Sequence, residues 1–547
     1  MSLKDLLKNT VAAGLKRQSI TSPSRWAEEY RVMGPPVSGK WRFEVTPWTR
    51  AMHDSDAPVN IGQKSAQMGF TETVLNITFY RIDIKNESCL YILPTKTPDA
   101  TEFSAARFDA ALELSDHLGN LFSNVKNVGH KRAGSANLYV GGANSRSFLK
   151  SKPVVFIVFD ELDEMKQENI PLAEERASFQ AEPQIWKIST PTIPKKRING
   201  YFLDTTQEHY FFKCPSCSRY TEIIFPDSLI ITADSKNDIK IKNSHIICTL
   251  CNTKLQHEDK KYFLKDGIWQ PTADPQNERR GFYINQLYSV NRKPHEIAEM
   301  FFDAQIDKAK EQEFWNSKGG LPHIVEGAQV NDIEIIRCLG SYPKATVSPE
   351  NTIITMGVDQ GRWLHYEICA WDFPSLGNDL NMIAKPKVLT MGKCVDFNEL
   401  DVLMKQYQIM AAVVDAQPDR RMAYEFACRF WGHVKLCFYA QGQSVKTITI
   451  DPDPDQHKIV VDRTSWLDTA LNRFHIDTIT LPRDTTEEYK DHLKNIVRHY
   501  REDSKGNPVA EYITTGADHF AHARCYAELA LPLAASLTTN KNIKVFL

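Results

Sequence analysis

One stretch constrains the fold more than any other: the apolar run Val154–Phe159, which ends in the adjacent carboxylates Asp160 and Glu161. A run without polar alternation is typical of a strand covered on both faces, the usual position in a parallel sheet. Its carboxylates would then lie where open α/β sheets bind ligands. In P-loop nucleotidases the first acid of such a pair holds Mg²⁺ and the next positions the attacking water. The alternative is a buried strand followed by a solvated acidic turn that includes Asp163 and Glu164.

The length and charge of the chain set further limits. A chain of 547 residues is too long to fold around one hydrophobic core, so about two to four domains are expected. No apolar stretch reaches the roughly 20 residues of a membrane span, and Met1–Asp5 lacks the features of a signal peptide, so we expect a cytosolic protein without a membrane segment. Because the net charge is -2, any contact with nucleic acid must come from local basic patches.

Strands alternate with helical patterns between residues 61 and 200, which predicts a doubly wound, mainly parallel α/β sheet. Later residues are richer in turns, and a strand–helix pattern restarts after residue 351. We therefore divide the chain into a lead-in segment that packs on the core (1–58), a P-loop core (59–204), a cysteine-containing insertion (205–275), a helical return to the core (276–337), a linker (338–350) and a second α/β domain (351–547).

A shifted phosphate-binding motif follows the strand candidate Val59–Ile61. A common Walker A loop reads Gly, four residues, Gly-Lys-Ser/Thr. Here Lys64 stands at the first Gly position and Phe70 at the Lys position. Lys64 would reach the β- and γ-phosphates of ATP from the opposite side of the loop.

The rest of this loop keeps the chemistry of a nucleotide site. Gly69 permits close backbone approach, the amides of Ser65–Gly69 can cradle phosphates, and Thr71 can ligate Mg²⁺ at a helix N-terminus. The alternative is a turn that binds nothing. The position of the loop about 90 residues before the acidic strand, the usual order of these motifs, favours a nucleotide site.

A third element completes this group. Ser189 and Thr190 end the next buried strand, before Pro191 and Thr192. Their hydroxyls could sense the γ-phosphate and couple hydrolysis to movement. A simple Ser/Thr turn before proline explains the same residues.

Four of the eleven cysteines form two CxxC pairs separated by 30 residues. Four thiolates suit a closed tetrahedral Zn²⁺ site, which is structural because no coordination position stays open. The long spacing predicts an inserted hairpin. Redox activity is the rival interpretation. The predicted ligands are Cys214, Cys217, Cys248 and Cys251.

Carboxylates also mark strand ends in the second α/β domain. Asp359 and Asp415 each end a buried strand, and Asp518 and His522 lie one turn apart on a late helix. Such a set makes a two-metal site for phosphodiester cleavage. Glu367 is a further candidate ligand. The alternative is that each Asp simply begins a loop.

Taken together, these motifs resemble the large subunit of tailed-phage DNA-packaging terminases, the lambda-type GpA group, over about residues 22–530. The resemblance rests on the order and coverage of its motifs rather than on any single one. They are Trp26–Arg31, Lys64–Thr71, Gly142–Ser145, Asp160–Glu164, Ser189–Thr192, the Cys214/Cys217 knuckle, Gly281–Ser289, Phe314–Ser317 and Gly357–Asp359.

The resemblance implies an N-terminal ATPase motor, a zinc-binding insertion and a C-terminal RNase H-like nuclease. By carry-over, Lys64 and Thr71 would bind MgATP, while Asp160 would hold Mg²⁺ and Glu161 would act as the catalytic carboxylate. The segment 189–191 would be the coupling motif. Asp359 and Asp415 would hold Mg²⁺ or Mn²⁺ in the nuclease, with either Asp518 or His522 as third ligand, since imidazole also binds Mn²⁺.

The implied function is ATP-driven movement of double-stranded DNA into a procapsid, with endonuclease cleavage that makes genome ends. The implied partners are double-stranded DNA, a terminase small subunit, the portal protein and further copies in a ring, in the host cytoplasm. Two alternatives stay open. One is a helicase or translocase whose C-terminal domain only docks, and the other is a non-enzymatic zinc-containing assembly protein.

Overall fold

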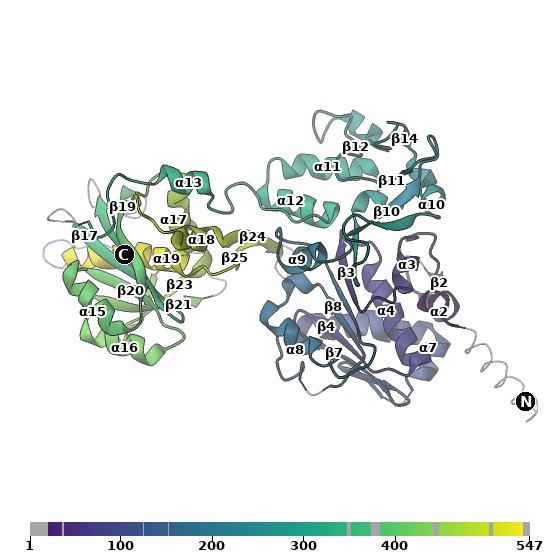
Figure 1. Ribbon diagram of the computed structural model, residues 1–547, viewed down its shortest axis with the longest axis horizontal. Coiled ribbons are helices and arrows are strands. Elements are labelled where there is room, and N and C mark those ends of the chain that lie inside the picture. The colour runs from purple at the N-terminus through teal and green to yellow at the C-terminus, as the bar shows by residue number, and fades with distance from the viewer. Residues whose placement is uncertain are drawn as a thin grey trace, which may run out of the picture. The chain divides into compact units, whose positions relative to one another are not determined.

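The computed structural model describes residues 20–35, 38–123, 125–150, 152–346, 352–372, 383–440, 448–502 and 507–539. The predictions for the first 19 residues and for 347–350 of the linker lie outside this part of the chain. The chain divides into two compact units, Met1–His323 and Ile324–Leu547 (Figure 1). No helix in the described part is long and apolar enough to cross a membrane.

Unit 1 is built on an eleven-stranded sheet. Its centre is parallel, in the order β16-β3-β9-β8-β4-β7, and the predicted acidic strand is β8, buried along its whole length. Short antiparallel strands, β6 (His130–Ala133) and β5 (Val125–Asn127), extend the sheet beyond β7. The central strands are β3 (Val59–Lys64), β4 (Cys89–Leu93), β7 (Ala136–Gly142), β8 (Phe156–Asp160), β9 (Gln184–Ser189) and β16 (Arg279–Ile284).

Both faces of this sheet are covered, which explains the unbroken apolar runs. Alternate side chains of β8 enter different cores: Phe156 and Val158 pack in one cluster, Ile157 and Phe159 in another. The prediction of an α/β fold with a mainly parallel sheet is confirmed. The surrounding helices include α2 (Pro23–Tyr30), α3 (Thr49–His53), α4 (Phe70–Tyr80), α6 (Ala110–Leu114), α7 (Asp116–Leu121), α8 (Ile170–Glu174) and α9 (Arg197–Leu203).

The cysteine-containing region is joined to the main sheet rather than attached beside it. Strand β10 (Glu208–Lys213) runs parallel to β16, and β15 (Ile268–Pro271) pairs antiparallel with β10. We expected residues 276–337 as a helical return, but they begin with β16, which lies beside the phosphate-loop strand β3. The other elements here are β11 (Tyr220–Thr221), a small sheet of β12 (Leu229–Ile230), β13 (His245–Ile247) and β14 (Lys254–Leu255), and helices α11 (Pro294–Ala304) and α12 (Lys308–Glu313).

Unit 2 contains a seven-stranded mixed sheet in the order β19-β18-β17-β20-β21-β23-β22. The predicted hairpin across residues 360–362 is present, because Gln360 of β17 pairs with Leu364 of β18. The strands are β17 (Ile353–Gln360), β18 (Leu364–Asp372), β19 (Lys385–Cys394), β20 (Ala411–Asp415), β21 (Val434–Ala440), β22 (Ile448–Ile450) and β23 (Lys458–Asp462).

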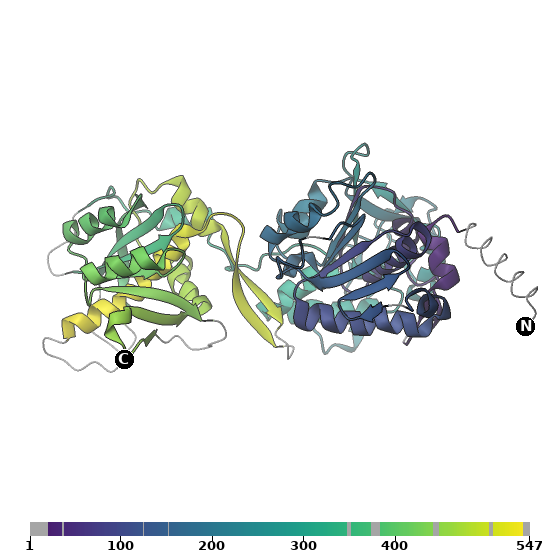
Figure 2. The ribbon, with the colours of Figure 1, turned by 90° about the horizontal axis from the view of Figure 1, so that it is seen from below.

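Helix α19 (His519–Thr539) crosses this sheet at Gly357. A β-carbon on Gly357 would lie 2.0 Å from the carbonyl oxygen of Ala523, so only glycine allows this approach. A hairpin of β24 (Ile496–Glu502) and β25 (Pro508–Thr514) extends from the body of the unit (Figure 2). The remaining helices are α13 (Asp332–Arg337), α15 (Phe397–Gln406), α16 (Arg420–Arg429), α17 (Arg463–His475) and α18 (Glu487–Lys494).

The boundary between the units lies before the predicted linker. Helix α13 belongs to unit 2, since Glu334 lies 2.8 Å from His475 of α17. Residues 332–337 therefore pack with the second unit and do not return to the first.

Candidate functional site

The predicted lysine and the acidic pair meet at the carboxyl edge of the unit 1 sheet. The Lys64 ammonium lies 2.9 Å from Glu161 Oε1. Beside it, Asp160 accepts hydrogen bonds from the hydroxyls of Tyr91, at 2.6 Å, and Thr71, at 3.4 Å. Strands β3, β4 and β8 and helix α4 thus bring together one cation, two carboxylates and two hydroxyls.

Burial and charge set the ionisation of this group. Burial raises the pKa of Asp160 to about 6, and the charge of Glu161 adds to this effect, while Lys64 and the two hydroxyls oppose it. Burial alone would lower the pKa of Lys64, but the charges of Glu161 and Asp160 raise it above its ordinary value. Lys64 therefore stays charged, and the oxygen ligands at Asp160 and Thr71 suit a hard cation such as Mg²⁺.

The phosphate loop has the backbone shape that its glycine predicts. Gly69 has φ +83° and forms the N-cap of α4, and Gln67 has φ +60°. A β-carbon on Gly69 would lie 3.2 Å from the methyl group of Thr46, so the packing as well as the backbone favours glycine.

The expected cradle of amides over Ser65–Gly69 is only partly available. The Ser65 amide donates to the carbonyl of Ile284, at 3.0 Å, and the Ala66 amide donates to Ser317, at 2.8 Å. Since β16 and the segment after α12 pack beside the loop, these two amides cannot bind a phosphate in this conformation. Ser65 is also completely buried. Of the predicted cradle, only the amides from Gln67 onward are left for a phosphate in this conformation.

Asp163 links the acidic strand to the predicted coupling segment. Its carboxylate accepts hydrogen bonds from the Thr192 amide (2.8 Å), the Thr192 hydroxyl (2.7 Å) and the Ile198 amide (2.8 Å). Its own amide donates to the Ser189 hydroxyl, at 3.1 Å, which in turn donates to the Thr190 carbonyl. Burial raises the pKa of Asp163 to about 6 against these hydrogen bonds.

From the sequence, Asp163 was expected in a solvated acidic turn or as an unassigned member of the Asp160–Glu164 motif, but it is 1% exposed. The sequence signal that could have identified it is its position just after the acidic pair Asp160–Glu161, in the stretch that leads to the Ser189–Thr192 segment. Glu161, two residues earlier, has φ +58°, an uncommon conformation for a non-glycine residue that often marks functional sites.

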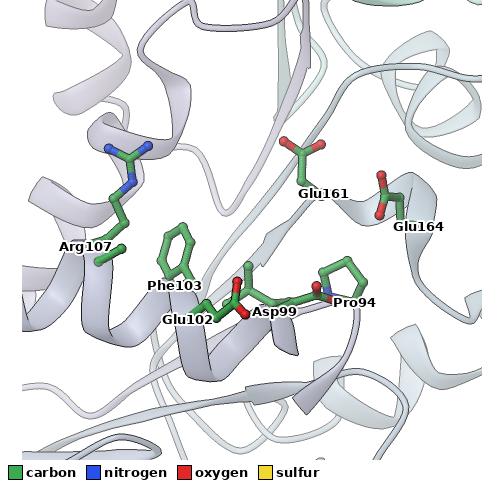
Figure 3. Close-up of a pocket in the computed structure, with 9 residues that line it drawn as sticks. Pro94, Asp99, Glu102, Phe103, Arg107, Glu161 and Glu164 are labelled. Carbon is green, nitrogen blue, oxygen red and sulfur yellow. The ribbon is translucent and has the colours of Figure 1, made fainter. Parts of the chain in front are cut away.

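Glu161 opens into a hollow of about 320 Å³. Figure 3 shows Glu161 and Glu164 on one side and Phe103 and Arg107 on the other. Arg107 is 3.1 Å from Glu72 on α4, so the wall of this hollow is tied to the helix that follows the phosphate loop. Its other lining residues are Leu93, Pro94, Asp99, Glu102 and Ala106.

The four predicted cysteines form one cluster, with their sulfur atoms all within 4.8 Å of one another. The two knuckles have the same backbone pattern. The Cys214 amide donates to Arg219 and the Cys248 amide to Thr253, both at 2.9 Å. Hydrogen bonding between Cys251 and the hydroxyl and amide of Thr253 lowers the pKa of the Cys251 thiol to about 6. Burial instead raises the pKa of the Cys214 thiol to about 11. The fit to Zn²⁺ therefore rests on the close grouping of four soft sulfur donors.

In unit 2, Asp359 and Asp415 lie on adjacent parallel strands, as predicted, because Val358 of β17 pairs with Val414 of β20. Burial, and then the charge of Asp359, raises the pKa of Asp415 to about 6. His519 Nδ1 lies 2.8 Å from Asp359 Oδ2. The sequence reasoning did not single out His519, although it stands next to Asp518.

Asp518 directly precedes α19, and His522 Nε2 lies 3.5 Å from its carboxylate. Burial opposes ionisation of Asp518, but His522, Thr514 and Arg463 lower its pKa to about 2. His522 also contacts Tyr439 and Arg463, at 3.1 and 3.3 Å. The anionic Asp518 is thus better suited to hold a cation than His522, which already has three polar neighbours.

The acids of unit 2 are less closely gathered than the cysteines. Within the described ranges, the cysteine cluster is the only group of three or more His, Cys, Asp or Glu residues whose ligand atoms all lie within 4.8 Å of one another. The fit to a metal here rests on the donor chemistry of Asp359, Asp415 and Asp518, since carboxylate oxygens suit Mg²⁺ and Mn²⁺.

Glu367 does not belong to this site, contrary to the sequence prediction. It is completely buried, 2.6 Å from Arg524 and 2.5 Å from the Tyr489 hydroxyl. Glu367 pairs with Gly357 across the strands, at the point where α19 crosses. Its carboxylate therefore faces the helix rather than the acids at the strand ends.

Two family models match this chain in consecutive regions. Residues 36–269 match the phage terminase large subunit gpA, ATPase domain, and residues 279–375 match the terminase large subunit gpA, endonuclease domain. These matches define the class as phage terminase large subunits. The chain belongs to the lambda-type, or GpA, family of that class.

Individual relatives are more distant. The terminase large subunit of Escherichia phage lambda is 23% identical over 408 residues, which cover 67% of this chain and 63% of that protein. The chain thus spans less than two thirds of its curated relative. Among solved structures, the HK97 bacteriophage large terminase covers 94% of this chain and 99% of its own, with 11% identity and a TM-score of 0.49. The large terminase nuclease of thermophilic phage G20c covers 36% and 94%, with 15% identity and a TM-score of 0.22.

Proposed function

We propose that unit 1 hydrolyses ATP to move double-stranded DNA into a viral procapsid, and that unit 2 cuts the DNA to generate genome ends. The observation that carries this proposal is the meeting of Lys64, Glu161 and Asp160 at the carboxyl edge of the sheet. It lies within the region that matches the family's ATPase domain. In unit 2, Asp359 lies within the region that matches the endonuclease domain, and Asp415 stands on the adjacent parallel strand.

In the proposed ATPase site, Lys64 and the loop amides from Gln67 onward would hold the phosphates of ATP. Asp160 and Thr71 would hold Mg²⁺, which neutralises phosphate charge. Glu161 would orient the attacking water and accept its proton. Because Lys64 and Glu161 form an ion pair here, nucleotide binding would transfer the ammonium to the phosphates and release the carboxylate for this role. The Ser189–Thr190 segment would sense the γ-phosphate.

In the proposed nuclease, Asp359, Asp415 and Asp518 would hold Mg²⁺ or Mn²⁺ in an RNase H-like domain. The metal would supply a nucleophilic water and stabilise charge on the phosphodiester. The antiparallel strands β19, β18 and β17 followed by parallel β20 and β21 support this proposal. Asp518 is preferred to His522 as third ligand because carboxylate oxygens suit Mg²⁺ and because both ring nitrogens of His522 already contact Tyr439 and Arg463.

The four cysteines would hold a structural Zn²⁺ ion between β10 and the small three-stranded sheet. Family membership supports further partners: a terminase small subunit, the portal protein and other copies of this chain in a ring, acting in the host cytoplasm. A zinc-containing assembly protein without enzymatic activity would not require the Lys64–Glu161 pair, so we favour the motor.

The first test is nucleotide binding by the full chain. Lys64→Ala removes the ammonium proposed to contact the phosphates, and should weaken ATP binding by at least about tenfold. Lys85→Ala, which removes an exposed lysine before β4, is the matched control. Equal ATP affinity in both variants and the wild type would reject the shifted-lysine site.

A further inference from the structure

The loop after β9 carries three consecutive basic residues, Lys195, Lys196 and Arg197. Both lysines are exposed, and neither forms an ion pair with any residue in the described ranges. Arg197 is half-buried, and its guanidinium donates a hydrogen bond to the carbonyl of Asp163. The three charges thus have different roles: one fixes the loop and two face solvent.

The base of this loop is attached to the proposed catalytic loop on both sides. Asp163, two residues after Glu161, binds Thr192 before the basic residues and Ile198 after them. A movement of the Glu161 loop would therefore move both ends of the lysine loop together.

A second attachment runs to the phosphate-binding strand. The Lys195 amide donates to the Asn199 side chain, at 2.6 Å. Asn199 in turn donates to Gln63, the residue before Lys64, at 2.9 Å. The lysine loop is therefore connected to the strands that carry both halves of the nucleotide site.

Neighbouring loops on the same edge of the sheet also carry exposed basic side chains without an ion pair in the described part of the chain. The acidic hollow is lined by residues after β4 and β8, so it lies on different loops from Lys195 and Lys196. With a net charge of -2, the chain has no general attraction for DNA, and such local groups must supply it. The neighbouring basic residues are Lys96, Arg146 and Lys166.

We propose that Lys195 and Lys196 bind phosphate groups of the DNA duplex, and that Asp163 couples their position to the nucleotide site. This inference rests on the proposed function and names the residues that would grip the DNA. The ligand chemistry is a phosphate diester on a duplex backbone, which is recognised by charge and not by sequence.

The test compares two double variants of the full chain. Lys195→Ala/Lys196→Ala removes the proposed contacts, and Lys85→Ala/Lys126→Ala removes two exposed lysines elsewhere in unit 1. Affinity for a random-sequence duplex is measured across salt concentrations. Each lost phosphate contact reduces the slope of log affinity against log salt by about 0.9, so we expect a loss of about 1.8 in the first variant and no change in the control.

Two outcomes would overturn the assignment. In both, the salt slope of Lys195→Ala/Lys196→Ala equals that of the control. If the KM for ATP is also unchanged, the lysines bind neither ligand, and if it is raised, they bind the nucleotide. A wild-type chain that binds no DNA or hydrolyses no ATP would instead refute the proposed function itself. The two failures are therefore distinguishable.

A second variant tests the coupling. Thr192→Val removes the hydroxyl that binds Asp163 and keeps a similar side-chain volume. We expect its DNA salt slope to match the wild type, while the stimulation of ATP hydrolysis by DNA falls at least threefold. Full stimulation in Thr192→Val, or its absence in the wild type, would refute the coupling through Asp163.

Discussion

The two units support their acidic sites with opposite kinds of buried polar groups. Beneath the P-loop helix α4 of unit 1, His53 contacts the Thr49 carbonyl, at 2.7 Å, and the Asn76 amide, at 3.1 Å, an arrangement that suits a neutral imidazole. Behind Asp359 in unit 2, helix α19 carries Arg524, whose guanidinium pairs with Glu367 and Glu528, both at 2.6 Å. One support is uncharged and the other is a buried ion network.

The two acidic sites also differ in the positive charge that lies beside their carboxylates. The proposed ATPase site contains its own cation, Lys64, whereas the acids of unit 2 have histidines as their nearest basic neighbours, His519 beside Asp359 and His522 beside Asp518. The built-in ammonium of Lys64 offsets part of the negative charge of Asp160 and Glu161 before a substrate binds. In unit 2 a bound metal ion would have to neutralise the acids. We therefore expect substitutions at the two sites to impair different activities.

The largest expected effect concerns Glu161. Glu161→Gln keeps the size of the side chain but cannot accept a proton from water, so ATP turnover should fall by about 10²–10⁴-fold with ATP binding retained. The measurement is steady-state hydrolysis together with nucleotide affinity. The exposed Glu168→Gln serves as control. Normal turnover in Glu161→Gln would remove this residue from the mechanism.

The second prediction tests the metal dependence of unit 2. Asp359→Asn should reduce Mn²⁺-dependent cleavage of plasmid DNA by about 100-fold or more, because it removes one negative ligand. ATP hydrolysis should be unaffected, and the exposed Asp455→Asn should cleave normally. If Asp359→Asn retains full cleavage, unit 2 is a docking domain and the helicase or translocase alternative gains support.

The third prediction concerns the buried ion network. Arg524→Ala leaves the carboxylates of Glu367 and Glu528 buried without this partner, which should cost about 3–5 kcal/mol of the stability of unit 2. The exposed pair Arg429–Asp401 offers the control, since Arg429→Ala should cost at most about 1 kcal/mol. Denaturant unfolding of the full chain measures both. Equal losses would show that the network contributes no more than a surface pair.

The smallest effect concerns the neutral support in unit 1. Burial lowers the pKa of His53 from 6.5 to about 4. Between pH 4 and 6.5 the unfolded chain therefore binds more protons at His53 than the folded chain does. The contribution of a neutral His53 to the free energy of unfolding is present above pH 6.5 and is lost as the pH falls towards 4. This contribution to the free energy of unfolding is about 3 kcal/mol. Asp160 and Asp163, whose pKa values are raised to about 6, act in the opposite direction.

A comparison with His53→Gln isolates the histidine from these carboxyl groups. The difference in unfolding free energy between wild type and variant should shrink on acidification from pH 6.5 to 4. A constant difference across this range would mean that His53 does not titrate as its burial requires.

The sequence predicted the parts of the fold that depend on local pattern. The buried run before Asp160 and the order of its motif relative to Lys64 were sufficient to expect a parallel sheet and a nucleotide site at its edge. The CxxC spacing likewise predicted which four cysteines meet. In unit 2, the turn after Gln360 predicted the hairpin that positions Asp359.

The features of the fold and of the sites that the sequence did not predict depend on contacts between segments far apart in the chain. Strand β16 enters the sheet beside β3 although more than 200 residues separate them, and no local pattern states which strand it joins. For the same reason the amides of Ser65 and Ala66 were expected to be free. Glu367 was a candidate ligand because its strand position could be predicted, whereas the crossing of α19 could not.

The strand order around the cysteine region has a consequence for the modularity of this chain. Strand β10, which leads into the first knuckle, lies beside β16, and β16 lies beside the strand that ends in Lys64. The region is therefore not a cassette that can be excised or transplanted with its two ends rejoined. Removing it would expose the edge of β16, the strand that lies directly beside β3.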